Sequence, residues 1–321
     1  MSAESVPRVS IGLPVFNGAR YIAEAINSHL NQTFGDFELI VSDNASEDET
    51  PEIIAEIAAK DSRVRFLRNE VNVGANRNYN ITLAASRGEY FRWHAHDDVL
   101  EPTFLERCVE RLDADPSVVL AYTQSILIDG KGRPFLPFGD VWLSEEGAIH
   151  REPEDPKFIR YASSELAHER FRAASFHFRA GAAFFGLIRR TAFKHSTLQQ
   201  PFYGTDRVVF VELALAGRFA LVEERLFLHR WHDEASRIMN NERDRAKWAD
   251  PNFTPGWYPR VVFFGYLNAI NRADISPSER TMAKLYLVRK ALRHEELARI
   301  VSVESISHLS FLTRRALGFG A

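Results

Sequence analysis

The sequence predicts an α/β fold, a sheet with flanking helices that is followed by a helical C-terminal extension. Between Val9 and His94, short apolar runs typical of strands alternate with longer stretches whose apolar residues recur at helical spacing. That alternation indicates consecutive βα units, which form parallel sheets with crossover helices. Beyond Asp250 the pattern changes, because residues 257–271 and 279–300 are both amphipathic at helical spacing.

The first half of the chain supplies four expected strands, at residues 9–15, 37–41, 64–67 and 90–94. Helices are expected in the three gaps, around residues 21–30, 51–57 and 75–86. Pro51 fits only the first turn of its helix, because proline has no N–H for an internal hydrogen bond. Gly88 ends the third helix before the fourth strand begins.

The second half continues with an expected helix at residues 104–112 and a strand at 118–128. Residues 133–165 are rich in proline, glycine and charge and lack periodicity, which predicts a long loop region of the kind that often serves as a lid. Two extended segments then flank one helix; they are expected at residues 176–189 and 219–231, with the helix at 208–216.

The composition is that of a globular protein, since 45% of the residues are hydrophobic. The length of 321 residues is that of one large domain with an appendage or of two domains. The 40 basic and 43 acidic residues leave a net charge of -3, so nucleic acid is not an expected partner. Cys108 is the only cysteine, which excludes an intrachain disulfide and predicts a reducing, cytoplasmic location. Neither a leader pattern nor a membrane-spanning apolar run is found, and attachment at the inner membrane face stays open.

Polar residues follow each of the first four predicted strands, where open parallel sheets bind their ligands. The four clusters are Pro14-Val15-Phe16-Asn17-Gly18, Ser42-Asp43-Asn44-Ala45-Ser46, Arg68-Asn69 and His96-Asp97-Asp98. Any one cluster is explained equally well as a cap for the next helix. Four clusters on one edge of one sheet favour a binding site.

The usual phosphate-binding motifs are absent from the sequence. No G-x-G-x-x-G follows the first strand, and no G-x-x-x-x-G-K-[ST] occurs anywhere. Asp97 and Asp98 instead offer carboxylate oxygens, which suit Mg²⁺ or Mn²⁺. The sequence therefore predicts a divalent metal ion between these carboxylates and a diphosphate that they would otherwise repel.

Four segments, in their order along the chain, resemble the donor half of a family 2 glycosyltransferase. They are Pro14–Asn17, Ser42–Thr50, Asn72–Asn78 and His96–Asp98. The resemblance implies an inverting enzyme with the GT-A fold, a Rossmann-like nucleotide-diphospho-sugar transferase fold with a mixed sheet. It implies a GT-A domain at residues 1–235, divided into a nucleotide-sugar-binding half at 9–130 and an acceptor half at 131–235. Residues 236–321 would form the helical C-terminal extension.

The resemblance also implies a pocket for the nucleotide. Pro14, Phe16 and Asn17 would shape the part that holds the base and the ribose. Asp43 would accept a hydrogen bond from the N3–H of uracil or thymine, which points to a UDP- or dTDP-linked donor.

Other donor contacts are expected from the helix at residues 75–86 and from the acidic pair. Arg77 and Asn78 would face the nucleotide sugar, although Arg77 could equally be a solvated helix residue. Asp98 would bind the metal ion and Asp97 would face the ribose and the diphosphate. His232 would reach the metal ion or the leaving phosphate, and its alternative role is that of a surface or capping residue.

Inverting transfer needs one base that removes the proton of the attacking hydroxyl. Asp206 lies where the family keeps this base, and its alternative role is the N-cap of the helix at residues 208–216. The acceptor would lie against Gly181-Ala182-Ala183-Phe184.

The predicted function is metal-dependent, inverting transfer of a sugar from a UDP- or dTDP-sugar to a hydroxyl of a glycan or glycolipid. A sugar-phosphate nucleotidyltransferase is an alternative, but it would need a Gly-rich basic loop where Asn17-Gly18-Ala19-Arg20 stands. The other alternative is a non-catalytic nucleotide- or glycan-binding module, against which Asp98 and Asp206 argue. The C-terminal helices would serve packing, peripheral membrane contact or a homodimer through the same apolar residues.

Overall fold

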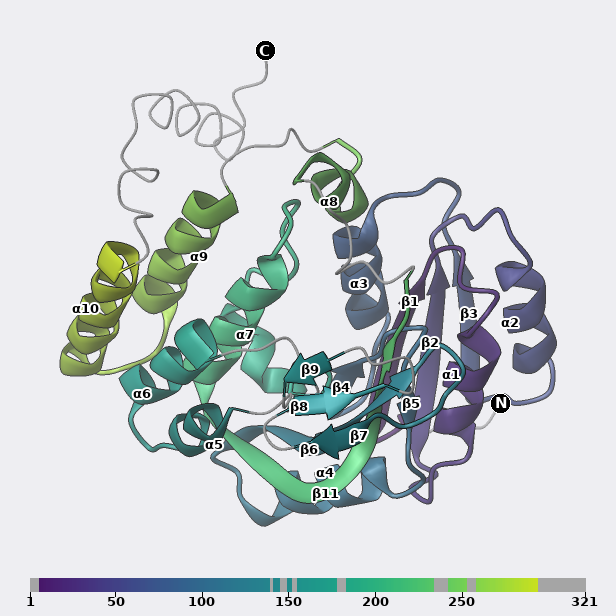
Figure 1. Ribbon diagram of the computed structural model, residues 1–321, viewed down its shortest axis with the longest axis horizontal. Coiled ribbons are helices and arrows are strands. Elements are labelled where there is room, and N and C mark those ends of the chain that lie inside the picture. The colour runs from purple at the N-terminus through teal and green to yellow at the C-terminus, as the bar shows by residue number, and fades with distance from the viewer. Residues whose placement is uncertain are drawn as a thin grey trace.

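A mixed eight-stranded sheet forms the centre of the computed structural model (Figure 1). The structure describes residues 6–138, 141–144, 149–151, 155–177, 183–233, 242–252 and 258–293. The strand order is β3-β2-β1-β4-β10-β6-β11-β5. The strands are β1 Val9–Val15, β2 Phe37–Asp43, β3 Val64–Arg68, β4 Tyr90–Trp93, β5 Val99–Leu100, β6 Val118–Asp129, β10 Leu187–Arg189 and β11 Arg218–Trp231.

The helices that follow the first strands confirm the predicted βα units. They are α1 Ile22–Leu30, α2 Thr50–Ala58, α3 Ala75–Ala84 and α4 Phe104–Ala114. Strands β3, β2, β1 and β4 run parallel, and β10 inserts antiparallel between β4 and β6. All residues of β1 and β2 are buried, including the polar Ser10 and Glu38, whose side chains form a hydrogen bond of 2.6 Å between the two strands.

The prediction of a long loop at residues 133–165 is wrong in part. Three short strands pair there as a second, antiparallel sheet, and a helix follows them. These elements are β7 Leu136–Phe138, β8 Val141–Leu143, β9 Ile149–Arg151 and α5 Pro156–Ala162. Strands of three residues are too short to produce a visible period of two, which is why the pattern missed them.

The prediction of an extended segment at residues 176–189 is also wrong at its N-terminal end. Phe176 and His177 belong to a π-helix, η1 Ala173–His177, which continues from α6 Ala167–Arg172. Residues 178–182 lie outside the described part of the chain, and β10 is the strand that follows. A 3-10 helix, η2 Arg190–His195, and then α7 Thr205–Ala216 lead to β11.

The C-terminal part is helical, as predicted, and includes one helix that the pattern did not indicate. The helices are α8 Glu242–Ala249, α9 Tyr258–Arg272 and α10 Pro277–Arg293, and residues 294–300 of the last predicted helix lie outside the described part. In Figure 1, α9 and α10 lie near α7 and α6, whereas α8 lies beside α3.

Two hydrophobic cores lie on the two faces of the sheet. One core contains alternate residues of β1 together with α1 and α4, and the other contains α7 and the buried faces of α9 and α10. Within the described residues, no helix is both long and apolar enough to cross a membrane.

Candidate active site

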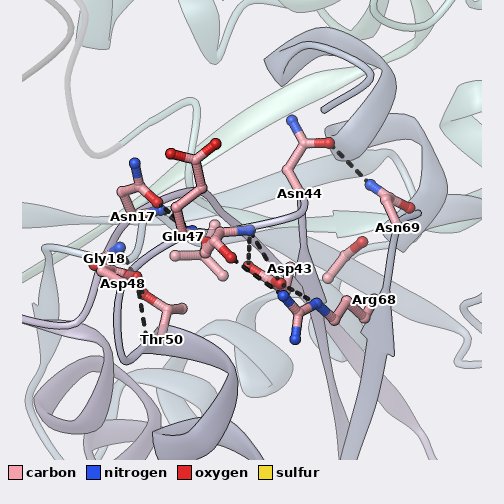
Figure 2. Close-up of polar contacts among 12 residues, drawn as sticks. Asn17, Gly18, Asp43, Asn44, Glu47, Asp48, Thr50, Arg68 and Asn69 are labelled. Carbon is pink, nitrogen blue, oxygen red and sulfur yellow. Dashed lines mark hydrogen bonds and ion pairs between the residues drawn. The ribbon is translucent and has the colours of Figure 1, made fainter. Parts of the chain in front are cut away.

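The corner after β1 is held by hydrogen bonds to the segment after β2 (Figure 2). The Asn17 N–H donates to Ser46 Oγ (2.8 Å), and the Gly18 N–H donates to Thr50 Oγ1 (2.8 Å). Asn17 has a positive φ of 51°, which asparagine tolerates better than most residues. This geometry leaves the Phe16 ring 41% exposed beside the corner, whereas Pro14 is buried within the sheet.

Asp43 ends β2 and its side chain is fully buried. Its carboxylate accepts weakly from the Ser46 N–H, at 3.2 and 3.3 Å, and lies 3.3 Å from Nε of Arg68. Figure 2 shows the Arg68 guanidinium lying against this carboxylate. The Arg68 side chain is half exposed, whereas the Asp43 carboxylate that it contacts is fully buried.

Asn78 lies in α3 and faces the sheet. Its Oδ1 accepts from Ser42 Oγ (2.6 Å) and from Asn69 Nδ2 (3.1 Å), and its Nδ2 donates to the Ser42 carbonyl (2.8 Å). The side-chain amide, expected from the sequence to face the nucleotide sugar, is thus used within the protein. It connects α3 to the ends of β2 and β3.

Two further asparagines of α3 hold the segment that leads to Asp206. Asn76 Nδ2 donates to the carbonyls of Gln200 (2.7 Å) and Phe202 (2.9 Å). Asn80 exchanges two hydrogen bonds with the Gln199 backbone, at 2.8 and 3.0 Å. Residues 76 and 80 are one helical turn apart, so this spacing was a readable signal of a polar helix face that sequence analysis missed.

Arg77, on the same helix, has its side chain 53% exposed. Its Nε lies 3.6 Å from Oδ2 of Asp250, a buried residue that directly follows α8. Helix α8, which lies within the expected C-terminal extension, therefore contacts α3, in the half of the chain expected to bind the nucleotide sugar.

Asp97 and His232 form the centre of the candidate site. Their Oδ2 and Nε2 atoms are 2.8 Å apart, and both side chains are mostly buried. His232 Nδ1 is buried, and no described residue forms a hydrogen bond with it. Burial opposes the charge on Asp97, but the His232 hydrogen bond and the imidazoles of His96 and His229 outweigh it and lower its pKa.

Asp98 is turned into the protein instead. Its Oδ1 accepts from the Arg230 N–H (2.8 Å), and its carbonyl lies 3.0 Å from Nε2 of His94. The Arg230 side chain, 1% exposed, donates to the Asp97 carbonyl (2.7 Å) and pairs with Glu24 (2.6 Å). Sequence analysis missed Arg230, which ties β11 to the acidic pair through both backbone and side chain.

Asp206 lies in the first turn of α7 and not at its N-cap, which is Gly204. The alternative role as an N-cap is therefore wrong. Asp206 is half-buried, and desolvation raises the pKa of its carboxyl against the opposing effect of Arg207. A carboxylate with a raised pKa is a better proton acceptor near neutral pH than an ordinary one.

The Tyr79 phenol lies within electrostatic reach of three carboxylates. Burial, and then the negative charges of Asp97, Asp98 and Asp206, raise the pKa of its phenol. Its ring packs near Trp93, with ring centroids 6.1 Å apart. The acceptor bed expected at Gly181-Ala182-Ala183-Phe184 lies half outside the described residues, and Phe184 is buried and stacked on Trp93 at 5.6 Å.

The residues present suit a hard divalent metal ion with few protein ligands. Within the part of the chain that the structure describes, no three His, Cys, Asp or Glu side chains form a metal-binding group. The Asp97 carboxylate and the His232 imidazole provide two ligand side chains, and Mg²⁺ and Mn²⁺ commonly bind one or two such groups and complete their coordination with substrate phosphates and water.

Solved structures share the fold along nearly the whole chain. The 1–349 fragment of S. aureus TarS in complex with UDP-GlcNAc matches 92% of this chain and 77% of its own, with a TM-score of 0.61 at 17% identity. The mannosyltransferase PcManGT from Pyrobaculum calidifontis, in complex with GDP-Man and Mn²⁺, matches 98% of this chain and 81% of its own, with a TM-score of 0.51 at 16% identity. These similarities confirm the GT-A fold that the sequence resemblance implied.

Related sequences match part of the chain. Chondroitin synthase from Escherichia coli is 37% identical over 127 residues, which cover 40% of this chain and 18% of that protein. The GalNAc(5)-diNAcBac-PP-undecaprenol beta-1,3-glucosyltransferase of Campylobacter jejuni is 25% identical over 209 residues, 65% of this chain and 60% of that one. The chain thus spans less than two thirds of these relatives. Residues 10–195, more than half of the chain, match the family described as Glycosyl transferase family 2, and the protein belongs to that family.

Proposed function

We propose that the protein is an inverting glycosyltransferase that moves a sugar from a UDP- or dTDP-sugar to a hydroxyl of a glycan or glycolipid. The observation that carries this proposal is the contact between Asp97 and His232 (2.8 Å), with Asp206 close enough for its charge to act on the same Tyr79 phenol as the charges of Asp97 and Asp98. A pair of acidic residues at one strand end and a separate carboxylate with a raised pKa are the two parts that direct displacement at an anomeric carbon requires.

In this reaction Asp206 accepts the proton of the acceptor hydroxyl. The hydroxyl oxygen forms a bond to the anomeric carbon while the bond from that carbon to the donor diphosphate breaks, so the configuration at the carbon inverts. One base suffices, because the leaving diphosphate takes the electron pair of the broken bond and needs no proton from a second group. The half-buried position of Asp206 keeps its pKa raised until the acceptor arrives.

We infer that Asp97 and His232 hold Mg²⁺ or Mn²⁺, in place of the Asp98 expected from the sequence. Asp98 already accepts the Arg230 N–H, whereas Asp97 meets an imidazole whose other nitrogen is unused by the described residues. The bound metal ion would neutralise the leaving diphosphate. The Mn²⁺ in the PcManGT complex supports a divalent ion in this fold.

Donor and acceptor classes are proposed from chemistry and from relatives. Asp43 as an acceptor favours a base with a protonated N3, and TarS was solved with UDP-GlcNAc and with UDP. The C. jejuni relative, by its name, extends a saccharide on PP-undecaprenol, which supports a glycolipid acceptor here. Phe16 would contact the base from its exposed position beside Asn17.

Peripheral contact of the C-terminal helices with a membrane follows from a glycolipid acceptor. The outer face of α10 exposes four large apolar side chains, Met282, Leu285, Val288 and Leu292. Lys284 and Arg289 on the same helix would attract anionic headgroups, whereas Lys290 is turned inward and donates to the Ser175 carbonyl. Co-sedimentation with phosphatidylglycerol vesicles should fall in a Leu285→Glu variant, and a homodimer that dissociates in that variant would replace this assignment.

The test of function is turnover of the donor. UDP-sugars and dTDP-sugars should raise the melting temperature in the presence of Mn²⁺, because a ligand of the native state stabilises it by mass action. The enzyme should also hydrolyse the UDP-sugar slowly, which releases UDP, and a suitable acceptor should accelerate this release. Donor binding without any hydrolysis or transfer would favour a binding module. Formation of a nucleotide sugar from a sugar phosphate and a nucleoside triphosphate would favour a nucleotidyltransferase.

A further inference from the structure

Helix α8 is fixed against the first turn of α3. Gly74, the N-cap of α3, has φ 87° and ψ 155°, a conformation that is nearly restricted to glycine. A Cβ atom at this position would lie 2.6 Å from the Ala249 carbonyl oxygen and 2.9 Å from Cα of Asp250. The end of α8 therefore packs directly on the backbone of α3, and the Asp250 carboxylate faces Arg77 from there.

The contact between α8 and α3 places an aromatic pair near the start of α7. Trp248 of α8 and Tyr203 have ring centroids 6.4 Å apart at an interplanar angle of 67°. The Arg245 guanidinium, also from α8, lies 5.4 Å from the Tyr203 centroid in a cation–π contact. Trp248 remains 37% exposed, which is high for the largest apolar side chain in a helix that is otherwise held in place.

The aromatic pair is tied to the candidate base. Tyr203 precedes Gly204, whose left-handed φ of 82° turns the chain into α7, and Asp206 lies in the first turn of that helix. The preceding residues are held by Asn76, which donates to the Phe202 carbonyl at 2.9 Å. Tyr203 therefore lies on the same segment that presents Asp206, and Trp248 of α8 packs against it.

We propose that Trp248, supported from the side by Tyr203, forms a platform for one pyranose ring of the acceptor glycan. A pyranose has a face of C–H groups that packs on the electron-rich face of an aromatic ring, while its hydroxyls point outward. The acceptor must lie beside the base that deprotonates it, and Tyr203, which packs against Trp248, precedes Asp206 by three positions. This inference rests on the proposed function and adds an acceptor subsite to it.

The test uses sugars that have no aromatic group of their own. Saturation-transfer NMR of the full chain with UDP and Mg²⁺, which is diamagnetic, would measure binding of methyl glycosides of glucose, galactose, N-acetylglucosamine, N-acetylgalactosamine and rhamnose. At least one should receive saturation on its C–H face, with an apparent affinity at least about tenfold weaker in Trp248→Ala. Trp248→Phe should retain most of the binding, and Leu166→Ala, which removes an exposed apolar side chain next to α6, should match the wild type.

A second measurement does not depend on the alanine variant being folded. The indole N–H signal of Trp248, assigned by its loss in Trp248→Phe, should shift during titration of the wild type with the same glycoside. An unmoved indole signal, equal glycoside affinity in Trp248→Ala, or no saturation of any glycoside by the wild type would each overturn the platform. UDP affinity in the same samples separates the two proposals: intact UDP binding and donor hydrolysis leave the proposed function standing when the platform fails.

Discussion

Asp97 Oδ2 lies 2.8 Å from Nε2 of His232, although the two residues are 135 positions apart in the sequence. The sheet explains the contact. Strand β5 follows Asp98 directly and pairs antiparallel with β11, with Val99 opposite Leu228. That pairing brings the end of β11, and with it Arg230 and His232, over the acidic pair.

Metal-linked donor binding should depend on Asp97 and His232. Asp97→Ala and His232→Ala are each expected to abolish the part of UDP binding that requires Mn²⁺, because they remove the two ligand side chains. Titration calorimetry with and without Mn²⁺ measures this. Asp98→Asn is the matched comparison, since it keeps the shape of the residue that accepts the Arg230 N–H. Loss of the metal-dependent part in Asp98→Asn alone would return the metal ion to Asp98.

Substitution of Asp206 should reduce the rate of sugar transfer without reducing donor binding. Asp206→Asn keeps the shape of the side chain but cannot accept a proton, so transfer should fall by about 10²- to 10⁴-fold while donor affinity stays close to that of the wild type. Single-turnover transfer and UDP titration give the two quantities. Wild-type transfer by the variant would mean that another group is the base.

Asp97 and Asp206 should affect stability with opposite signs. Asp206 has a raised pKa in the folded state, so its charge costs stability above the unfolded pKa of about 3.9, and Asp206→Asn should raise the melting temperature near neutral pH. Asp97 has a lowered pKa, so its charge contributes stability above about pH 3.9 that is lost as the pH falls through the folded pKa. Asp97→Asn should therefore lower the melting temperature near neutral pH. Shifts of the same sign in both variants would contradict this assignment.

Base selectivity tests Asp43. Uracil and thymine nucleotides should bind more tightly than CDP by about 1 to 3 kcal/mol, because cytosine presents an unprotonated N3 to the carboxylate. Arg68→Ala should increase access to Asp43, since the Arg68 guanidinium lies 3.3 Å from it and is half exposed. Tighter binding of CDP or GDP than of UDP would remove Asp43 from base recognition.

The position of α8 depends on Gly74. Gly74→Ala should cost about 1 to 3 kcal/mol from backbone strain, and more from the collision with Ala249 and Asp250. Gly35→Ala is the control, because a Cβ there meets no atom within 4 Å. Urea unfolding of the two variants measures the difference. Equal stability of the two would show that α8 is not seated on α3.

The sequence alone was sufficient for much of the fold. Alternating apolar periods predicted the first four strands and their helices, since each βα unit carries its own local pattern. The sequence also predicted which strand ends carry Asp43, Asp97 and Asp98, because a parallel sheet brings its carboxyl ends to one edge. The ordered motifs correctly indicated the family.

Only the tertiary structure decided how these residues divide the work. Strand β5 has two residues and no readable period, yet its pairing with β11 decides that Asp98 accepts a backbone N–H while Asp97 meets His232. Likewise, α8 lies next to α3 because Gly74 admits its backbone, a contact between residues 175 positions apart. Contacts of this kind depend on packing between segments that are distant in the sequence, so a local sequence pattern cannot predict them.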